Sequence, residues 1–80
     1  MAIEDFSKAI SLSDNNPSLF NNRGSSYDNI KSYDLAIRDY TNAIKLDTNN
    51  ALYYNNRGYS YQNSGKFEEA IEDYTSAIKR

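Results

Sequence analysis

The sequence contains an internal repeat. The segment Asn21–Gly24 recurs as Asn55–Gly58, and residues 17–46 share 15 identities in 30 positions with residues 51–80. Residues 2–10 form a third, partial copy of the second half of this unit at the same displacement. A unit this short cannot bury its apolar face alone and must stack on its neighbours. The repeat therefore restricts the fold to a stacked array of similar units.

Each unit contains two segments whose apolar residues follow the period of a helix. In the second segment of the first unit these residues are Ala36, Ile37, Tyr40, Ala43 and Ile44. This spacing forms an apolar stripe along one helix face. Asn, Asp, Ser and Gly, which favour turns, separate the segments. The sequence predicts an all-α fold of antiparallel helix pairs, with five helices at about residues 2–12, 18–30, 34–46, 52–64 and 67–79.

A chain of 80 residues supports one small domain. We expect residues 1–14 to form the second helix of an incomplete unit, 17–50 a complete unit, and 51–80 a unit that lacks its last residues. The small residues Gly24 and Gly58 should let the two helices of each unit approach closely. The tyrosines should then fill the space between units as aromatic plates with a polar edge.

The composition narrows the classes of function. Nine Lys and Arg against 11 Asp and Glu give a net charge of −2, whereas a nucleic-acid-binding surface needs a surplus of positive charge. Cysteine and histidine are absent, which excludes thiolate chemistry and removes the commonest metal ligand. The acidic residues at 68–73 fit a solvated helix face near the positive end of the helix dipole. We expect no enzymatic activity, no metal and no cofactor.

The apolar runs of the sequence are short. The longest hold about four residues, far below the roughly 20 that a membrane-spanning helix needs. No basic segment followed by an apolar stretch marks a signal peptide. We therefore expect no membrane partner and a cytoplasmic location.

The residues at the fixed positions of the repeat resemble the tetratricopeptide repeat, a family of right-handed helical solenoids. The matching residues are Phe20, Gly24, Tyr27, Ala36, Tyr40 and Ala43 in the first unit, Tyr54, Gly58, Tyr61, Ala70, Tyr74 and Ala77 in the second, and Ala2, Phe6 and Ala9 in the leading half. The resemblance covers the whole chain. It implies a right-handed α-solenoid that serves as a scaffold or protein-interaction module.

Three positions depart from the family pattern. Arg23 and Arg57 stand where the pattern has leucine, and we expect each stem to cover apolar surface while the head reaches water. Lys31 replaces the turn glycine that is present at Gly65, and a left-handed residue other than glycine costs about 1 kcal/mol. The closing proline is absent, so a helix that continues through residues 47–50 or through the Lys31 turn, with units exchanged between chains, is an alternative.

In this family the first helix of each unit lines a concave groove that usually binds peptide. The resemblance places a nearly uncharged, amide-rich set there: Asn21, Asn22, Ser25, Asn29, Asn55, Asn56, Tyr59 and Asn63. A side-chain amide both donates and accepts, which matches a peptide unit, and some relatives use asparagines at the Asn22 and Asn56 positions in this way. The alternative is that these are solvated residues of a chain with 11 asparagines.

One kind of groove ligand is disfavoured. Relatives that hold the carboxylate tail of heat-shock chaperones carry Lys and Arg in the groove, because a buried carboxylate needs charged donors. This sequence offers Asn and Ser at the corresponding positions, so we do not expect it to bind such a tail.

A second hypothesis is structural. The two ends of the array leave apolar residues without a further unit to cover them. These residues are Ile3, Phe6 and Ile10 at one end, and Tyr74 and Ile78 at the other. Repeat arrays normally carry polar caps. These uncovered apolar residues therefore predict a homo-oligomer that assembles through its terminal helices. The partner is then a second copy rather than a peptide.

Overall fold

The structure, a computed structural model, describes residues 2–80 and consists of five helices. They are α1 (Ala2–Leu12), α2 (Pro17–Asn29), α3 (Tyr33–Leu46), α4 (Ala51–Asn63) and α5 (Phe67–Lys79). The all-α fold and the number of helices are confirmed, and the helix ends lie within a single residue of the predicted ones. No helix among residues 2–80 is long and apolar enough to cross a membrane.

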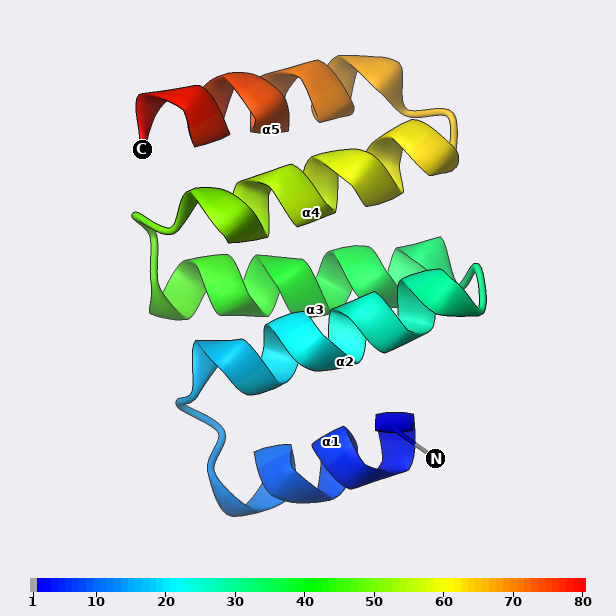
Figure 1. The fold of residues 1–80 in the computed structure, drawn as a ribbon, viewed down its shortest axis with the longest axis vertical. Coiled ribbons are helices and arrows are strands. Elements are labelled where there is room, and N and C mark those ends of the chain that lie inside the picture. Colours follow the sequence, from blue (N-terminus) through cyan, green and yellow to red (C-terminus); the bar gives the residue numbers. More distant parts are fainter. Residues whose placement is uncertain (1) are drawn as a thin grey trace.

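The helices stack in chain order (Figure 1). Helix α2 packs along α3 and α4 along α5, while α3 also contacts α4, α1 contacts α2, and α2 touches α4. The resulting slab measures 34 × 26 × 12 Å. Every helix is thus held by helices that are close to it in sequence, as a solenoid requires.

Asparagine precedes the first helix of each helix pair, α2 and α4. The Asn16 side chain accepts a hydrogen bond from the backbone N–H of Ser18 at 3.0 Å, and Asn50 does the same for Leu52 at 3.0 Å. Each bond satisfies one of the N–H groups that the first helical turn leaves unpaired. Pro17 occupies the first position of α2, where its missing N–H costs nothing.

The turn inside each unit ends the first helix with a left-handed residue. Lys31 has φ 64° and Gly65 has φ 84°. The N–H of Ser32 bonds to the carbonyl oxygen of Tyr27 at 2.9 Å, and the N–H of Lys66 bonds to that of Tyr61 at 2.8 Å. This is the closing bond of a Schellman motif, so Lys31 adopts the conformation that glycine adopts at Gly65.

Helices α3 and α4 are separate. Helix α3 ends at Leu46, where the N–H of Asp47 bonds to the carbonyl oxygen of Ala43 at 3.0 Å, and α4 begins at Ala51. The structure therefore shows neither a helix that continues through residues 47–50 nor one that continues through the Lys31 turn.

The core runs between the helices as a row of aromatic and small side chains. Its main cluster comprises Ile10, Phe20, Ala43, Ile44, Tyr53, Tyr54 and Ala77. Beside it, the ring of Tyr40 lies directly against Gly24. Tyr40 is 1% exposed, and a methyl group built on Gly24 would lie 2.7 Å from its Cε1. The glycine is therefore required by close packing, as the sequence predicts.

We predict that Gly24→Ala destabilises the protein more than Gly58→Ala. The methyl group of Gly58→Ala would lie 3.0 Å from Cε1 of Tyr74, whose ring is only half-buried, and 3.3 Å from the backbone oxygen of Ala70. Overpacking against a fixed ring costs about 1–3 kcal/mol, whereas alanine in a helix gains about 1 kcal/mol over glycine. Urea unfolding should show a clear loss for Gly24→Ala and a small change for Gly58→Ala. Equal losses would contradict this account.

We also predict that Lys31→Gly stabilises the protein by about 1 kcal/mol, because it removes the steric cost of a left-handed side chain. The matched variant Gly65→Lys imposes the same cost on the second unit and should shift the urea midpoint in the opposite direction. A lower midpoint for Lys31→Gly would show that the lysine side chain contributes more than its backbone conformation costs.

Candidate functional site

An arginine–aspartate pair joins the two helices of the first complete unit. Nε of Arg23 donates to Oδ2 of Asp39 at 2.8 Å, and Nη2 donates to Oδ1 at 2.7 Å. The remaining nitrogen, Nη1, donates to the hydroxyl of Ser7 at 3.1 Å. Arg23 thus connects α1, α2 and α3. Asp39 is fully buried, so Arg23 takes the place of water as the partner of both its carboxylate oxygens.

The second unit repeats the arrangement at the equivalent positions. Arg57 donates to both carboxylate oxygens of Asp73 at 2.8 Å, and its Nη1 donates to the hydroxyl of Thr41 at 3.1 Å. The hydrogen bond from each guanidinium to its aspartate raises the arginine pKa above its ordinary value. The Arg57 guanidinium also lies 5.9 Å from the ring centre of Tyr54 and 5.8 Å from that of Tyr61.

These pairs correct two expectations. The guanidinium heads do not end in water: the Arg23 side chain is 15% exposed and is paired with a buried carboxylate. Asp73 is not part of a solvated acidic face, because it is 4% exposed and bonded to Arg57. The available signal was the separation of 16 residues between arginine and aspartate, which recurs in both units.

A second polar cluster centres on Asp28. The hydroxyl of Tyr40 donates to Oδ2 of Asp28 at 2.7 Å, and that of Ser60 donates to Oδ1 at 2.6 Å. Burial and the hydrogen bond to this carboxylate raise the pKa of Tyr40 above its ordinary value. In the second unit Gln62 takes the place of Asp28 and accepts from the hydroxyl of Tyr74 at 2.8 Å.

We use the term amide face for the eight polar residues that the sequence assigns to a peptide groove. Two of them meet: Nδ2 of Asn56 donates to Oδ1 of Asn21 at 2.8 Å, which joins α4 to α2. Both side chains are half-buried. The other six members are exposed: Asn22, Ser25 and Asn29 on α2, and Asn55, Tyr59 and Asn63 on α4.

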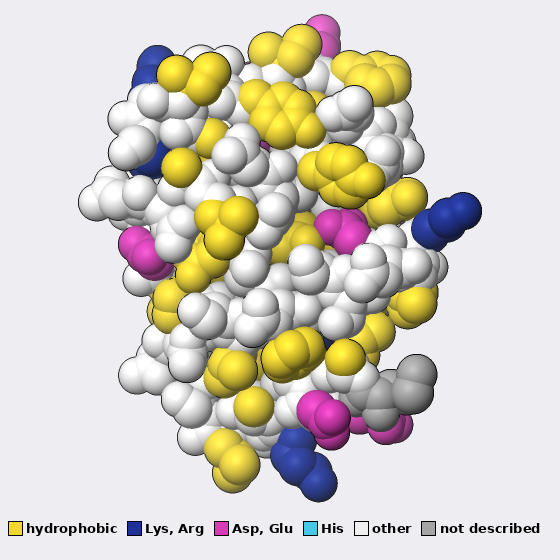
Figure 2. All heavy atoms as spheres, in the orientation of Figure 1, with side chains coloured by type: hydrophobic (Ala, Val, Ile, Leu, Met, Phe, Trp, Pro, Cys, Tyr) yellow, Lys and Arg dark blue, Asp and Glu magenta, His cyan; other side chains and the backbone are white. Residues whose placement is uncertain are grey.

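The amide face carries no formal charge of its own. Two of its positions are exposed in both units, since Ser25 and Asn29 of α2 correspond to Tyr59 and Asn63 of α4. Leu52 and Tyr59 add exposed apolar surface to α4. In the view of Figure 2 the positive side chains lie at the margin, while white polar and yellow hydrophobic groups cover most of the middle.

The apolar residues predicted to remain open at the two ends differ in exposure. Ile78 on α5 is 86% exposed, while Tyr74 beside it is half-buried. On α1, Ile3 and Phe6 are half-buried, and Ile10 belongs to the main core cluster. The expectation of an open apolar end is therefore wrong for Ile10, because α1 turns this residue into the core that it shares with α2.

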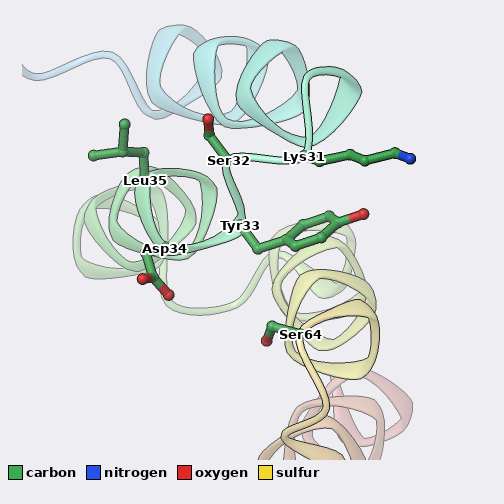
Figure 3. Close-up of a pocket in the computed structure, with 6 residues that line it drawn as sticks. All are labelled: Lys31, Ser32, Tyr33, Asp34, Leu35 and Ser64. Atoms are coloured by element: carbon green, nitrogen blue, oxygen red, sulfur yellow. The ribbon is translucent and has the colours of Figure 1, made fainter.

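Two open hollows lie outside the amide face. One, of about 420 Å³, is lined by Lys31, Ser32, Tyr33, Asp34, Leu35 and Ser64, at the turns that end α2 and α4 (Figure 3). The other, of about 260 Å³, is lined by Asp14, Phe20, Asn42, Lys45 and Leu46. Neither hollow contains a predicted peptide contact, so a peptide on the amide face would lie along the surface of α2 and α4.

Comparisons with family models match most of the chain. A model described as tetratricopeptide repeat matches residues 51–80, and a second, described as TPR repeat, matches residues 30–65. A comparison with curated proteins gives no match.

Several solved structures share the fold over nearly the whole chain. The second TPR of Spaghetti (RPAP3), bound to the HSP90 peptide SRMEEVD, is 32% identical with a TM-score of 0.91, and the match covers 95% of this chain and 70% of that one. The first TPR of the same protein, bound to the same peptide, is 30% identical with a TM-score of 0.93, covering 96% and 61%. MamA is 25% identical with a TM-score of 0.93, covering 96% and 42%, so this chain spans less than half of MamA.

We predict that Asp39→Ala lowers the free energy of unfolding by about 3 kcal/mol, because it leaves Arg23 without its carboxylate in a mostly buried position. The double variant Arg23→Leu with Asp39→Ala removes both charges and should recover most of the loss. Urea unfolding of the two variants tests this. Equal losses would show that the volume of Asp39, rather than the unpaired charge, is what matters.

Proposed function

Because the chain belongs to the tetratricopeptide repeat family, we propose that it is a non-catalytic interaction module whose amide face binds an extended peptide. The observation that carries the proposal is the row of exposed amides and hydroxyls on α2 and α4, which continues from one unit to the next. Two solved relatives, 30% and 32% identical, are complexes with a peptide, which supports the same use of the fold.

Amide side chains suit a peptide backbone. Each offers a carbonyl oxygen and an NH₂ group, which complement the N–H and C=O of a peptide unit. Asn22 is exposed and has this full capacity, while Asn56 uses one N–H on Asn21 and keeps its second N–H and its oxygen. Asn22 and Asn56 therefore form the main backbone contacts, with Asn21, Asn55, Tyr59 and Asn63 in support.

The charge of the surface sets the class of peptide. Lys and Arg are absent from the amide face, whereas the carboxylate of Asp28 lies between α2 and α4 with neutral hydroxyl partners. A peptide that ends in several carboxylates would meet this charge without a cation to offset it. The preferred ligand is a neutral or basic extended segment, with an apolar side chain against Leu52 and Tyr59.

We predict that Asn22→Ala with Asn56→Ala weakens peptide binding at least about tenfold, because two hydrogen bonds to the backbone are lost. Short peptides selected from a random displayed library on the wild-type chain serve as probes, and calorimetry gives the affinity. Asn42→Ala, on α3 outside the amide face, is the matched control and should bind normally. Asn21→Ala separates the loss of the Asn21–Asn56 contact from the loss of the binding amides. Unchanged affinity in the double variant, with normal helicity, would refute the proposal.

We further predict that the peptide SRMEEVD binds this chain at least about a hundredfold more weakly than a selected neutral or basic peptide, because the carboxylates of SRMEEVD lack charged partners here. Fluorescence anisotropy of the labelled peptide measures this directly. Tight binding of SRMEEVD would overturn the charge argument while leaving peptide binding itself intact.

A further inference from the structure

Helix α5 carries an apolar stripe that no other helix in residues 2–80 covers. Ile71 is 64% exposed and Ile78 is 86% exposed. Their counterparts in α3, one repeat earlier, are Ile37, which is half-buried, and Ile44, which is 8% exposed beside α4. In α3 the corresponding stripe is covered by α4, the first helix of the following unit. The stripe on α5 is therefore the equivalent face, which no helix among residues 2–80 covers.

Three polar contacts fix the position of α4, the first helix of the second unit, on the first unit. On α4, Asn56 bonds to Asn21, Ser60 to Asp28 and Arg57 to Thr41. All three contacts come from α4 and reach both helices of the preceding unit, α2 and α3. They therefore fix the position of α4 on that unit as well as stabilise the interface.

Corresponding residues are present at the two ends of the stack. One repeat beyond Asn21, Asp28 and Thr41 lie Asn55, Gln62 and Thr75, all exposed. One repeat before Asn56, Arg57 and Ser60 lie Asn22, Arg23 and Ser26, all on α2. Helices α4 and α5 of one molecule are thus complementary in hydrogen bonding to α2 of another.

Helix α1 occupies the complementary face of α2 and resembles α5. Six of its residues are identical to those two repeats later, namely Ala2, Ile3, Glu4, Asp5, Ala9 and Ile10. Ser7 of α1 accepts from Nη1 of Arg23 at 3.1 Å, as Thr41 accepts from Arg57 at 3.1 Å. Thr75 is the matching residue of α5.

We propose that α5 of one copy docks onto α2 of a second copy and displaces the α1 helix of that copy. Ile78 then replaces Ile10, Thr75 accepts from Arg23, and Asn55 meets Asn22 across the joint. The contact uses different surfaces of the two copies, so it is heterologous and extends head to tail into a continuous solenoid.

The exchange is feasible because α1 is held on one side. It contacts α2 alone among the described helices, and its Leu12 is 84% exposed. Its Ile10 is the buried residue that α5 would have to replace. Helix α5 remains anchored to α4 while it docks, so the ordering of α5 is not a cost of association. The new contact replaces an interface of the same type and adds the Asn55–Asn22 and Gln62–Ser26 contacts.

Ile10→Ala and Ile78→Ala form a matched pair that tests the exchange. Ile10→Ala weakens the docking of α1 and should strengthen association about tenfold or more, whereas Ile78→Ala should weaken association by a similar factor. Light scattering over a wide concentration range measures both, with Ile30→Ala, an exposed residue outside the stripe, as the control. A decrease for both variants, or no association of the wild type, would overturn the proposal.

Cross-linking tests the geometry without relying on a core variant. The chain has no cysteine, so the exposed Asn22→Cys and Asn55→Cys each introduce a single thiol. A short bis-maleimide should join the two variants when they are mixed, and neither variant when it is alone. Dimers of Asn55→Cys alone would indicate a symmetric contact through α5 and refute the head-to-tail arrangement, as would the absence of mixed dimers.

These readouts are independent of peptide binding. Cross-linking and mass report contacts between copies in the absence of any peptide, so a failure of one proposal leaves the other standing. If both hold, each added copy lengthens the amide face by α2 and α4.

Discussion

The contact between a guanidinium and a buried carboxylate organises this fold. A leucine in place of Arg23 would stabilise the contact with the neighbouring helices only by burying apolar surface, and this contribution has no preferred direction. The arginine instead makes two bonds to Asp39 and a third to Ser7, so it sets the rotation and height of three helices at once. The same set of bonds at Arg57 gives the second unit the same geometry. The close repetition of the units follows from polar specificity as much as from apolar packing.

The fold was predictable from the sequence because it depends on local signals. The repeat period, the helical apolar stripes and the small residues opposite tyrosine each act over one turn or one helix pair, and the helices follow them closely. Lys31 shows the limit of such rules, since the surrounding packing holds a lysine in a glycine conformation. The separation of 16 residues between Arg23 and Asp39 recurs in the second unit, but a recurring separation does not show that the two charges meet or that the carboxylate is buried.

The candidate site, like the fold, is predictable from the sequence in part. The repeat predicts which positions of α2 and α4 share a face, and their exposure fits that interpretation. It does not predict that Asn21 and Asn56 bond to each other, because the two residues lie on neighbouring units and are 35 residues apart. On the amide face asparagine therefore has two uses: Asn21 and Asn56 join neighbouring units, while Asn22 and Asn55 present exposed amide groups.

Contacts between near neighbours have a mechanical consequence. Helix α1 touches α2, α3 bridges α2 and α4, and α5 touches α4, so no helix within residues 2–80 closes the stack by returning to its beginning. A force that pulls α1 away from α5 is borne in full by the α1–α2 and α4–α5 interfaces, whereas between α2 and α4 it is shared by their direct contact and the path through α3. Among the described helices α1 contacts α2 alone, through a smaller interface than the one that joins α4 and α5, so α1 gives way first. Under tension residues 2–80 therefore open first at α1, and their length is set by how many helix–helix interfaces remain intact.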